Sequence, residues 1–429
     1  MRYLYILLLT GIAIACKPKK VEPTYNLGSI DISSFIAIGG DRVAGFQDDA
    51  LSYNGQMNSL GSIINNQFNQ VGFSNYNQPL INDQNLGINL NGDAQLIMGY
   101  KTDCNNETSL SPVRYASQGL TSALSEDLYT SNGPFHNLGV PGMSITDLYV
   151  AGFANPFYQR FKSSGSASVA SDVIQNTPTF LLSDFGQDDL MQYALSGGNT
   201  NPIIDEVTFE LSYAQLLDEF QNTATKGILC NIPDITQFPY FTTIPFNGLE
   251  LDATNANTMN QVFNPLGMSF VEGTNPFTVE DSNEPFGVRK LVEGELILLS
   301  VPLDSVKCNG MGSIIPIPEE YVLSLDEINE INQKRIAYNE KIQTLATAYS
   351  FAVADFESVY NSVNLGLVHN GVSFSNQFVS GGFFSLDGRN PTSKGMALLA
   401  NECIKAMNKK YESNIPQTEV NGFDGIYFP

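Results

Sequence analysis

Short apolar runs that end at glycine turns recur along the chain and alternate with segments of helical spacing. Phe35–Ile38 stops at Gly39-Gly40, Thr179–Leu182 is followed by Gly186, and Gly227–Pro233 contains a third run. Runs of this length bounded by turn residues are typical of buried strands. Strands that alternate with helices predict an α/β fold in which a parallel sheet carries helices on both faces.

Helical patterns fill the intervals between these runs. Apolar positions recur at helical spacing from the first turn through Phe68. Ser324-Leu-Asp-Glu327 has the form of a capping box and predicts a long helix to about Ser350. A final helix is expected from Ser393 to about Glu412. Pro134–Gly142 reads as a strand end that passes into a loop.

The pattern divides the mature chain into one body with two additions. Hydrophobic residues make up 42% of the chain, which is enough for a substantial core. We predict a single domain over residues 31–429. Within it, the Asn- and Gln-rich stretch 65–92 is expected to be a surface excursion. Residues 234–323, rich in Pro, Gly and short β-type runs such as Leu296–Val301, are expected to be an insertion.

The first residues have the pattern of an export signal. Residues 1–15 combine Arg2 with an apolar run that is too short to span a bilayer. Ala13-Ile14-Ala15-Cys16 resembles a bacterial lipobox, in which the cysteine is lipidated, so residues 16–30 would form a lipidated tether. The alternative is ordinary cleavage near Ala15. We therefore expect a lipid anchor in the outer membrane, with the facing undetermined.

Composition excludes several classes of function. The formal net charge is −23, so a basic face for nucleic acid cannot be assembled. With 2 His and 5 Cys, sites built from several His or four Cys are nearly excluded, and no cofactor is predicted. Cys104, Cys230, Cys308 and Cys403 allow two disulfides in three connectivities. A buried free thiol at Cys403 is an equal alternative, since it lies on an apolar helical stripe.

Several segments in chain order carry a family resemblance. They are Ile36–Phe46, Asn137–Gly142, Gly186–Asp189 with Tyr193–Gly198, Asn231–Asp234, Gly294–Leu299, Cys308–Gly312 and Gly381–Gly388. Together they resemble the SGNH/GDSL hydrolases, specifically the lipoprotein branch common in Bacteroidetes, over nearly the whole mature chain. The resemblance implies a three-layer flavodoxin-like fold and a site for esterase or lipase chemistry at the carboxyl ends of the strands.

The resemblance also implies a set of catalytic residues, most of which this chain lacks. The family uses a Ser nucleophile, a Gly amide and an Asn side chain that donate to the oxyanion, and a His in an Asp-x-x-His loop. The matching positions here are Asp41, Gly142, Asp188 and Asn390, with Asp387 of the loop retained. An ionised Asp188 accepts hydrogen bonds, and Asn390 cannot act as a base. The sequence therefore predicts a pseudoenzyme with a vestigial site.

Other residues offer no replacement for the missing parts. His136 and His369 both lie outside the family's base position, and we expect structural imidazoles. Arg42 and Arg389 are expected to neutralise the vestigial carboxylates in a buried salt-bridge cluster. The alternatives are open, solvated carboxylates, or Ca²⁺ held by the oxygens of Asp41, Asp188 and Asn390, with Asp189 and Asp387 nearby.

The leading functional prediction is a non-catalytic outer-membrane lipoprotein that serves as an accessory or binding subunit of an envelope protein complex. Its expected partners are an outer-membrane protein or envelope complex and, through the lipid, the membrane itself. One alternative is an active esterase or lipase on acyl or acetyl esters; another is a Ca²⁺-dependent or carbohydrate-binding surface module. Asp304-Ser305-Val306 also matches a short O-glycosylation pattern at Ser305.

Overall fold

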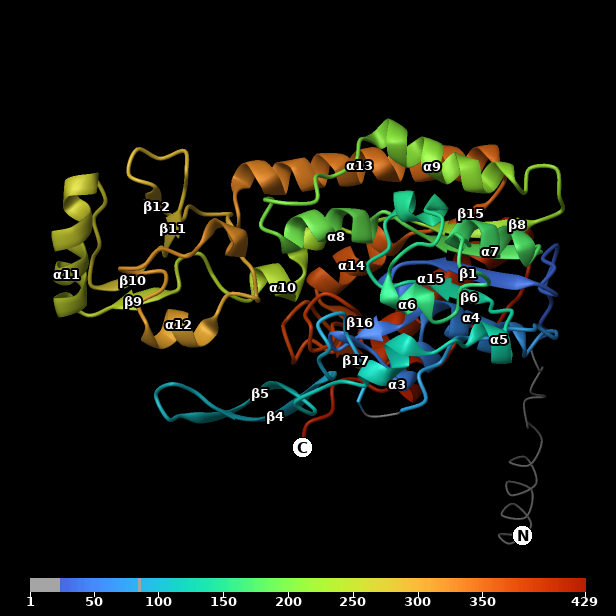
Figure 1. Ribbon diagram of the computed structural model, residues 1–429, viewed down its shortest axis with the longest axis horizontal. Helices are drawn as coiled ribbons and strands as arrows, with labels where there is room; N and C mark the ends of the chain where they lie inside the picture. Colours follow the sequence, from blue (N-terminus) through green and yellow to red (C-terminus); the bar gives the residue numbers. More distant parts are fainter. Residues whose placement is uncertain (1–23, 84–85) are drawn as a thin grey trace, which may run out of the picture.

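The structure is a computed structural model that describes residues 24–83 and 86–429. Its centre is a five-stranded parallel sheet in the order β15-β8-β7-β1-β6 (Figure 1). The strands are β1 (Phe35–Gly39), β6 (Asn137–Gly139), β7 (Phe180–Asp184), β8 (Lys226–Cys230) and β15 (Ala352–Ala354). Counted along the chain, this is the 2-1-3-4-5 order of flavodoxin-like folds. The predicted fold class is confirmed.

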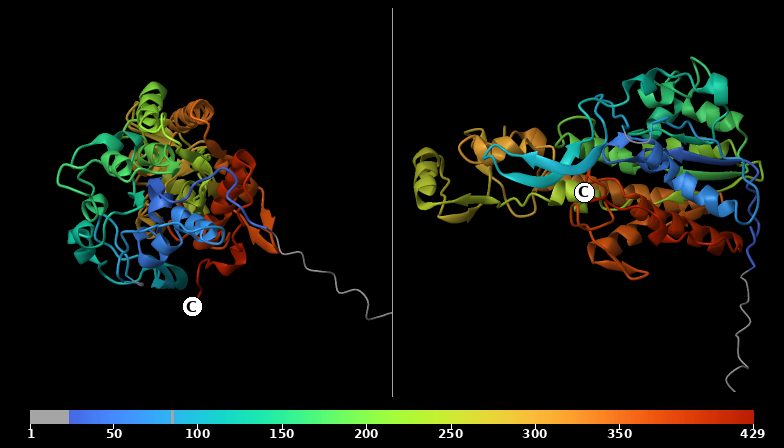
Figure 2. Two further views of the ribbon diagram at one scale, coloured as in Figure 1. Left: turned by 90° about the vertical axis from the view of Figure 1, so that its right-hand side faces the viewer. Right: turned by 90° about the horizontal axis from the view of Figure 1, so that it is seen from below.

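Helices cover both faces of the sheet. α4 (Leu60–Phe68) and α15 (Ser393–Tyr411) pack on one face, and α8 (Gln187–Leu195), α9 (Glu206–Asp218) and α13 (Leu325–Ala348) cover the other (Figures 1 and 2). Because helices enclose both faces, every residue of β1 and β7 is buried. Strands in this position are typically continuous apolar runs in the sequence.

The two long helices begin where the sequence predicts. The Ser324 hydroxyl accepts the backbone N–H of Glu327, whose carboxylate accepts the N–H of Ser324 in return, so the capping box is present. α15 follows its cap residue Thr392 and buries an apolar stripe. Further helices of the body are α5 (Tyr129–Asn132), α6 (Pro156–Gln159), α7 (Val169–Gln175) and α14 (Phe356–Asn364).

The prediction of helical structure from the first turn through Phe68 is wrong for most of that segment. The chain forms α2 (Asp41–Ala44), a small hairpin of β2 (Phe46–Gln47) and β3 (Ala50–Leu51), α3 (Tyr53–Met57) and only then α4. Gly45 ends α2 in the left-handed conformation, at φ 82°. Asp48 and Asp49 form the hairpin turn with φ 54° and 55°, a conformation that cannot continue a helix.

Residues 69–83 and 86–95 run along the body without a helix or strand. Several of their side chains are nevertheless buried against the body, among them Ser74, Ile81, Ile88 and Asn89. The chain then leaves the body as a hairpin of β4 (Leu96–Thr102) and β5 (Thr108–Arg114). A second hairpin, β16 (Leu367–His369) and β17 (Val372–Phe374), precedes the loop that leads to α15.

Residues 234–323 extend from the carboxyl edge of the sheet and form the left end of the molecule in Figure 1. They contain α10 (Pro239–Thr242), α11 (Ala253–Phe263), α12 (Leu303–Cys308) and the short strands β9 (Leu249–Leu251), β10 (Gly273–Asn275), β11 (Thr278–Glu280), β12 (Val288–Lys290), β13 (Leu296–Ile297) and β14 (Val322–Leu323). Two apolar clusters lie here apart from the main core, one around Phe277 and Ile317 and one around Met259 and Phe263.

The structure decides among the cysteine alternatives. Cys104, at the tip of the β4–β5 hairpin, forms a disulfide with Cys308 of α12, while Cys230 and Cys403 are buried free thiols. The predicted signal peptide and lipidation site at Cys16 lie outside the described residues. Within residues 24–83 and 86–429, no helix has both the length and the apolar character needed to cross a bilayer.

Candidate functional site

The carboxyl ends of β1, β6 and β7 meet the loop 385–390 at one edge of the sheet. β1 lies between β6 and β7, so the chain turns in opposite directions on its two sides. Such a switch point is where ligands bind in open α/β sheets, because the loops diverge there. The structure brings all predicted residues of the vestigial site together at this point: Asp41, Gly142, Asp188, Asp387 and Asn390.

Asp41, which begins α2 directly after β1, is the centre of the vestigial site. Its Oδ1 accepts the backbone N–H of Gly142 at 2.9 Å, and its Oδ2 accepts the side-chain amide of Asn390 at 3.1 Å. Arg389 Nη1 lies 3.7 Å from the same Oδ2. The Asp41 carboxylate is therefore directed inward, and it uses a backbone donor that the family resemblance assigns to the oxyanion.

Asp188 is positioned by the first turn of α8. Its Oδ2 accepts the backbone N–H of Asp41 at 3.3 Å. Gly40 makes this approach possible, because a Cβ at that position would lie 1.7 Å from Asp188 Oδ2. Both backbone donors of the site, at Asp41 and Gly142, thus face carboxyl groups of the chain itself.

The loop 385–390 closes the site from the side of α15. The Asn390 amide donates to Asp41 Oδ2 and, at 3.2 Å, to Asp387 Oδ2, so it bridges two carboxylates. Asp387 Oδ1 accepts the backbone N–H groups of Asn390 and Arg389 at 2.8 and 2.9 Å. This Asx-type turn fixes the loop without a base at position 390.

The β2–β3 turn holds this loop in place, and sequence reasoning missed it. The N–H of Asp49 donates to Asp387 Oδ2 at 3.1 Å, and the carboxylate of Asp48 accepts the N–H of Leu386 at 2.9 Å. Asp48 N–H also donates to the hydroxyl of buried Ser385 at 3.0 Å. The only sequence signal was a pair of adjacent aspartates, residues that tolerate the left-handed conformation.

The expected neutralisation by arginine is present at Asp41 for Arg389, whereas Arg42 forms its ion pair with Asp184 and not with Asp41. Arg42 turns away from Asp41 and pairs with Asp184 at the end of β7, with Nη2–Oδ1 and Nε–Oδ2 distances of 2.6 and 2.8 Å. Its guanidinium also lies 5.0 Å from the centre of the Phe356 ring. Both partners are almost fully buried. Asp184 satisfies the guanidinium fork. Arg389 is therefore the cation beside Asp41, whereas the charge of Arg42 acts on Asp188, whose pKa it lowers against the effect of burial.

Burial governs the titration of the site. It raises the pKa of Asp41, although Arg389, Asn390 and the Gly142 N–H oppose the shift. The pKa of Asp188 is raised well above its ordinary value, first by burial and then by the charge of Asp41. Two carboxylates this close do not both ionise readily, and we assign the proton to Asp188 because Asp41 has the better donors.

The remaining predicted residues have structural roles around the site. Asp189 accepts the N–H groups of Gly186 and Ile145, both at 3.1 Å, as part of the α8 cap, and burial raises its pKa to about 7. His136 Nδ1 accepts the N–H of Asn77 at 3.1 Å, and burial lowers the pKa of this imidazole. His369 lies on the separate β16–β17 hairpin.

The oxygens named as candidate Ca²⁺ ligands at Asp41 and Asp188 accept hydrogen bonds from the chain itself. Among residues 24–83 and 86–429, no three His, Cys, Asp or Glu side chains gather in a way that could hold a metal ion. The Asn390 side chain presents its amide nitrogen to Asp41 and Asp387, so it does not offer its oxygen toward them.

Ser305 lies half-buried in α12, and its proposed glycosylation stays a prediction.

Comparison with known proteins gives limited matches. No protein-family model and no curated protein matches the chain. Three solved structures are similar: a GDSL-like lipase from Bacteroides thetaiotaomicron (13% identity, 67% of this chain and 83% of that one, TM-score 0.28), a GDSL-like lipase candidate from Parabacteroides merdae (11%, 88% and 98%, 0.32) and a lipase/acylhydrolase from Enterococcus faecalis (12%, 71% and 93%, 0.28). The strand order is that of flavodoxin-like folds, and the motifs of the resemblance converge at one edge of the sheet, as an SGNH/GDSL-like fold implies.

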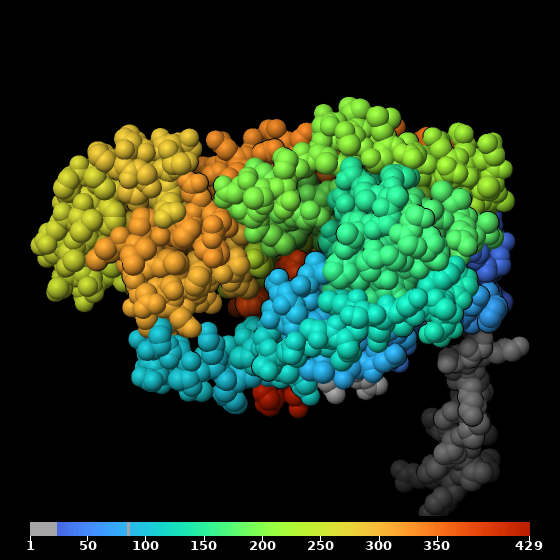
Figure 3. Space-filling view, in the orientation of Figure 1, coloured from blue at the N-terminus to red at the C-terminus, as the bar shows by residue number. Residues whose placement is uncertain are grey.

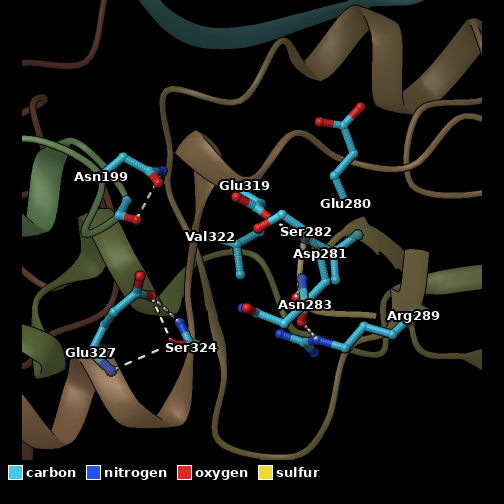
Figure 4. Close-up of a pocket in the computed structure, with 12 residues that line it drawn as sticks. Asn199, Glu280, Asp281, Ser282, Asn283, Arg289, Glu319, Val322, Ser324 and Glu327 are labelled. Atoms are coloured by element: carbon cyan, nitrogen blue, oxygen red, sulfur yellow. Dashed lines mark hydrogen bonds and ion pairs between the residues drawn. The ribbon is translucent and has the colours of Figure 1, made fainter. Parts of the chain in front are cut away.

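A small pocket elsewhere on the molecule is also charged. It has a volume of about 240 Å³ and lies between the loop after α8, the start of α13 and residues 279–289 (Figure 4). Arg289 in this pocket is held by Asp281 at 2.5 Å and by Glu295 at 2.7 Å. Glu327 caps α13, and Glu319 accepts the N–H of Ser282. The charged residues that line this pocket are therefore paired within the insertion or at the cap of α13, and none of them belongs to the vestigial site.

Proposed function

We propose that this chain is a non-catalytic, lipid-anchored protein of the outer membrane that acts as an accessory or binding subunit of an envelope protein complex. Its SGNH/GDSL-like body is a scaffold that presents a pocket, a hairpin and a large insertion. The proposal combines the closed vestigial site with the lipobox-like sequence at Cys16.

One observation carries the loss of catalysis. The residues at the nucleophile, oxyanion and base positions hydrogen-bond to one another: Asp41 to Gly142 and Asn390, and Asp188 to the N–H of Asp41. A protonated Asp188 still has a proton to donate, so its charge alone does not exclude catalysis. The side-chain amide of Asn390, at the position of the family's base, cannot accept a proton from water, and this supports the loss of catalysis.

The orientation of the body supports a role away from the membrane. The first described residues lie beside the end of α15, where Asn26 and Asn414 exchange backbone hydrogen bonds and Ser29 N–H donates to Tyr411. This is the amino edge of the sheet, opposite the vestigial site and the insertion (Figure 1). A lipid on Cys16 would therefore hold the amino edge toward the bilayer and leave the carboxyl edge free for a partner.

A pull-down from native membranes tests the accessory role. The tagged full-length lipoprotein is solubilised from outer membranes in mild detergent, captured and analysed by mass spectrometry. We expect a membrane protein in stoichiometric amount. A variant with Cys16→Ser, added to the same solubilised membranes, is the control: partner binding through the protein surface survives this change. Recovery of the lipoprotein alone would contradict the proposal.

The esterase alternative has its own test. Fluorophosphonate probes label activated serines, and intact-protein mass spectrometry detects one adduct. We expect no adduct on the native protein, because no histidine stands at the base position to activate a serine. Ser385, the serine that contacts the β2–β3 turn, is fully buried and accepts the N–H of Asp48. An adduct on any serine would favour the active enzyme.

A further inference from the structure

A pocket of about 630 Å³ opens in front of the vestigial site, between the β4–β5 hairpin and the insertion. Its floor is formed by the loop around Asp387 and Arg389 together with Tyr240, and its walls by the hairpin and α12. In the space-filling view a hollow is visible between these two walls (Figure 3). We call this cavity the strap pocket, because the hairpin crosses from the body to the insertion along its side.

The Cys104–Cys308 disulfide is the main link between the β4–β5 hairpin and α12. Most of the hairpin beyond its base is exposed. Apart from the Cys104–Cys308 bond, its tip meets α12 through the Lys101–Asp304 pair at 3.2 Å and through Lys307, which contacts Asp103 and Glu107. The lysine side chains are about half exposed, and ion pairs of this kind contribute little to stability.

The charges in the strap pocket are already paired. Arg114 and Arg389 both contact Asp49, at 2.6 and 3.1 Å, and the two lysines pair with hairpin or α12 acids. The rest of the lining is uncharged. It includes the apolar side chains of Leu299, Leu303 and Phe378 and the hydroxyls of Ser109 and Ser111. A charged ligand would have to break an existing pair, whereas an uncharged one would not.

We propose that the strap pocket is a binding site for an uncharged ligand with an apolar body and hydroxyl or amide groups, and that the Cys104–Cys308 disulfide builds the site by holding its hairpin wall. Its volume lies in the range of about 300–1,000 Å³ found for small-molecule sites. The proposal goes beyond the accessory role, because binding here requires neither catalysis nor a protein partner. It can therefore fail or stand independently of the pull-down.

The test measures binding of Nile red, a neutral dye whose fluorescence rises in apolar surroundings. The protein used is the full chain with Cys16→Ser, which removes the candidate lipidation site. We expect saturable binding of one dye. Leu303→Asp places a charge in the pocket wall and should weaken binding at least fivefold. Leu211→Asp is the matched control: Leu211 is also a helical leucine, 65% exposed against 48% for Leu303, but lies on α9 outside the pocket. Equal affinities of the two variants, or no dye binding, would overturn the proposal.

Two further experiments test whether the disulfide is needed for binding and which kind of ligand binds. The double variant Cys104→Ser/Cys308→Ser should keep its circular dichroism spectrum but lose dye affinity to a degree similar to Leu303→Asp; unchanged affinity would refute the role of the disulfide. Octyl glucoside and a blocked, uncharged leucine dipeptide then compete with the dye. Displacement by the first indicates an alkyl source and by the second a peptide source, and displacement by neither contradicts the ligand class.

Discussion

At the scale of single residues, the vestigial site is a set of buried acids at the positions where the family resemblance implies a catalytic set of mixed chemistry. Asp41 takes two hydrogen bonds and lies near Arg389, while Asp188 is held against Gly40 with a strongly raised pKa. Buried carboxyls of this kind cost free energy when ionised. The cluster therefore makes the stability of the protein depend on pH.

Asp48 offers a clean measure of this cost. Burial raises its pKa to about 7, so the folded state keeps a proton that the unfolded chain has already released above about pH 4. Stability therefore falls as pH rises from about 4 to about 7. Asp48→Asn, which tolerates the left-handed turn and keeps an acceptor for Leu386, should raise the free energy of unfolding at pH 8 by up to about 4 kcal/mol.

Urea unfolding of the native protein and of Asp48→Asn at pH 5 and pH 8 checks this prediction. The difference between the two pH values should shrink in Asp48→Asn and stay unchanged in Asp424→Asn, since Asp424 is exposed. An Asp48→Asn protein that keeps the full pH dependence would show that this carboxyl is not the titrating group.

The Arg42–Asp184 pair is the second residue-scale case. Both side chains are nearly fully buried, and removing one partner leaves the other charge unpaired in the core. Arg42→Met should therefore lower the free energy of unfolding by about 3–5 kcal/mol. The double change Arg42→Met/Asp184→Leu should recover much of that loss in the same urea experiment. A double variant less stable than the single one would indicate that the pair itself stabilises the fold.

At the scale of elements, the sequence predicted those parts whose signals are local. β1, β7, β8, α13 and α15 follow from apolar runs, glycine turns and caps. The β2–β3 turn was missed because two left-handed aspartates leave no periodic pattern. The β4–β5 hairpin was missed, and its disulfide was left open among three connectivities. Cys104 and Cys308 are 204 residues apart, and no local signal selects that pairing.

The cap of α13 gives a prediction at this scale. The Ser324 hydroxyl satisfies the N–H of Glu327 at the start of this helix, which packs against α8, α9 and the sheet. Ser324→Ala should lower the free energy of unfolding by about 1 kcal/mol in urea. Thr344→Ala, on the exposed surface of the same helix, is the control and should leave stability the same or slightly higher because alanine favours helices. Equal effects of both changes would rule out a role for the cap.

At the scale of the whole molecule, the two edges of the sheet carry different features. The amino edge carries the start of the described chain, and the carboxyl edge carries the vestigial site, the strap pocket and the insertion. The convergence of the site residues was predictable because the ends of parallel strands meet at one edge. The partner of Arg42 was not, since Asp184 stands at the end of its strand without a distinguishing motif.

The loss of catalysis is the central claim, and ester turnover tests it most directly. Hydrolysis of short p-nitrophenyl esters is measured at high protein concentration for the native protein and for Asp41→Asn, which keeps the size of the side chain but removes its charge. The account predicts that both rates equal the rate in buffer. Turnover by the native protein that Asp41→Asn abolishes would contradict it, and the chain would then be an esterase with an aspartate nucleophile.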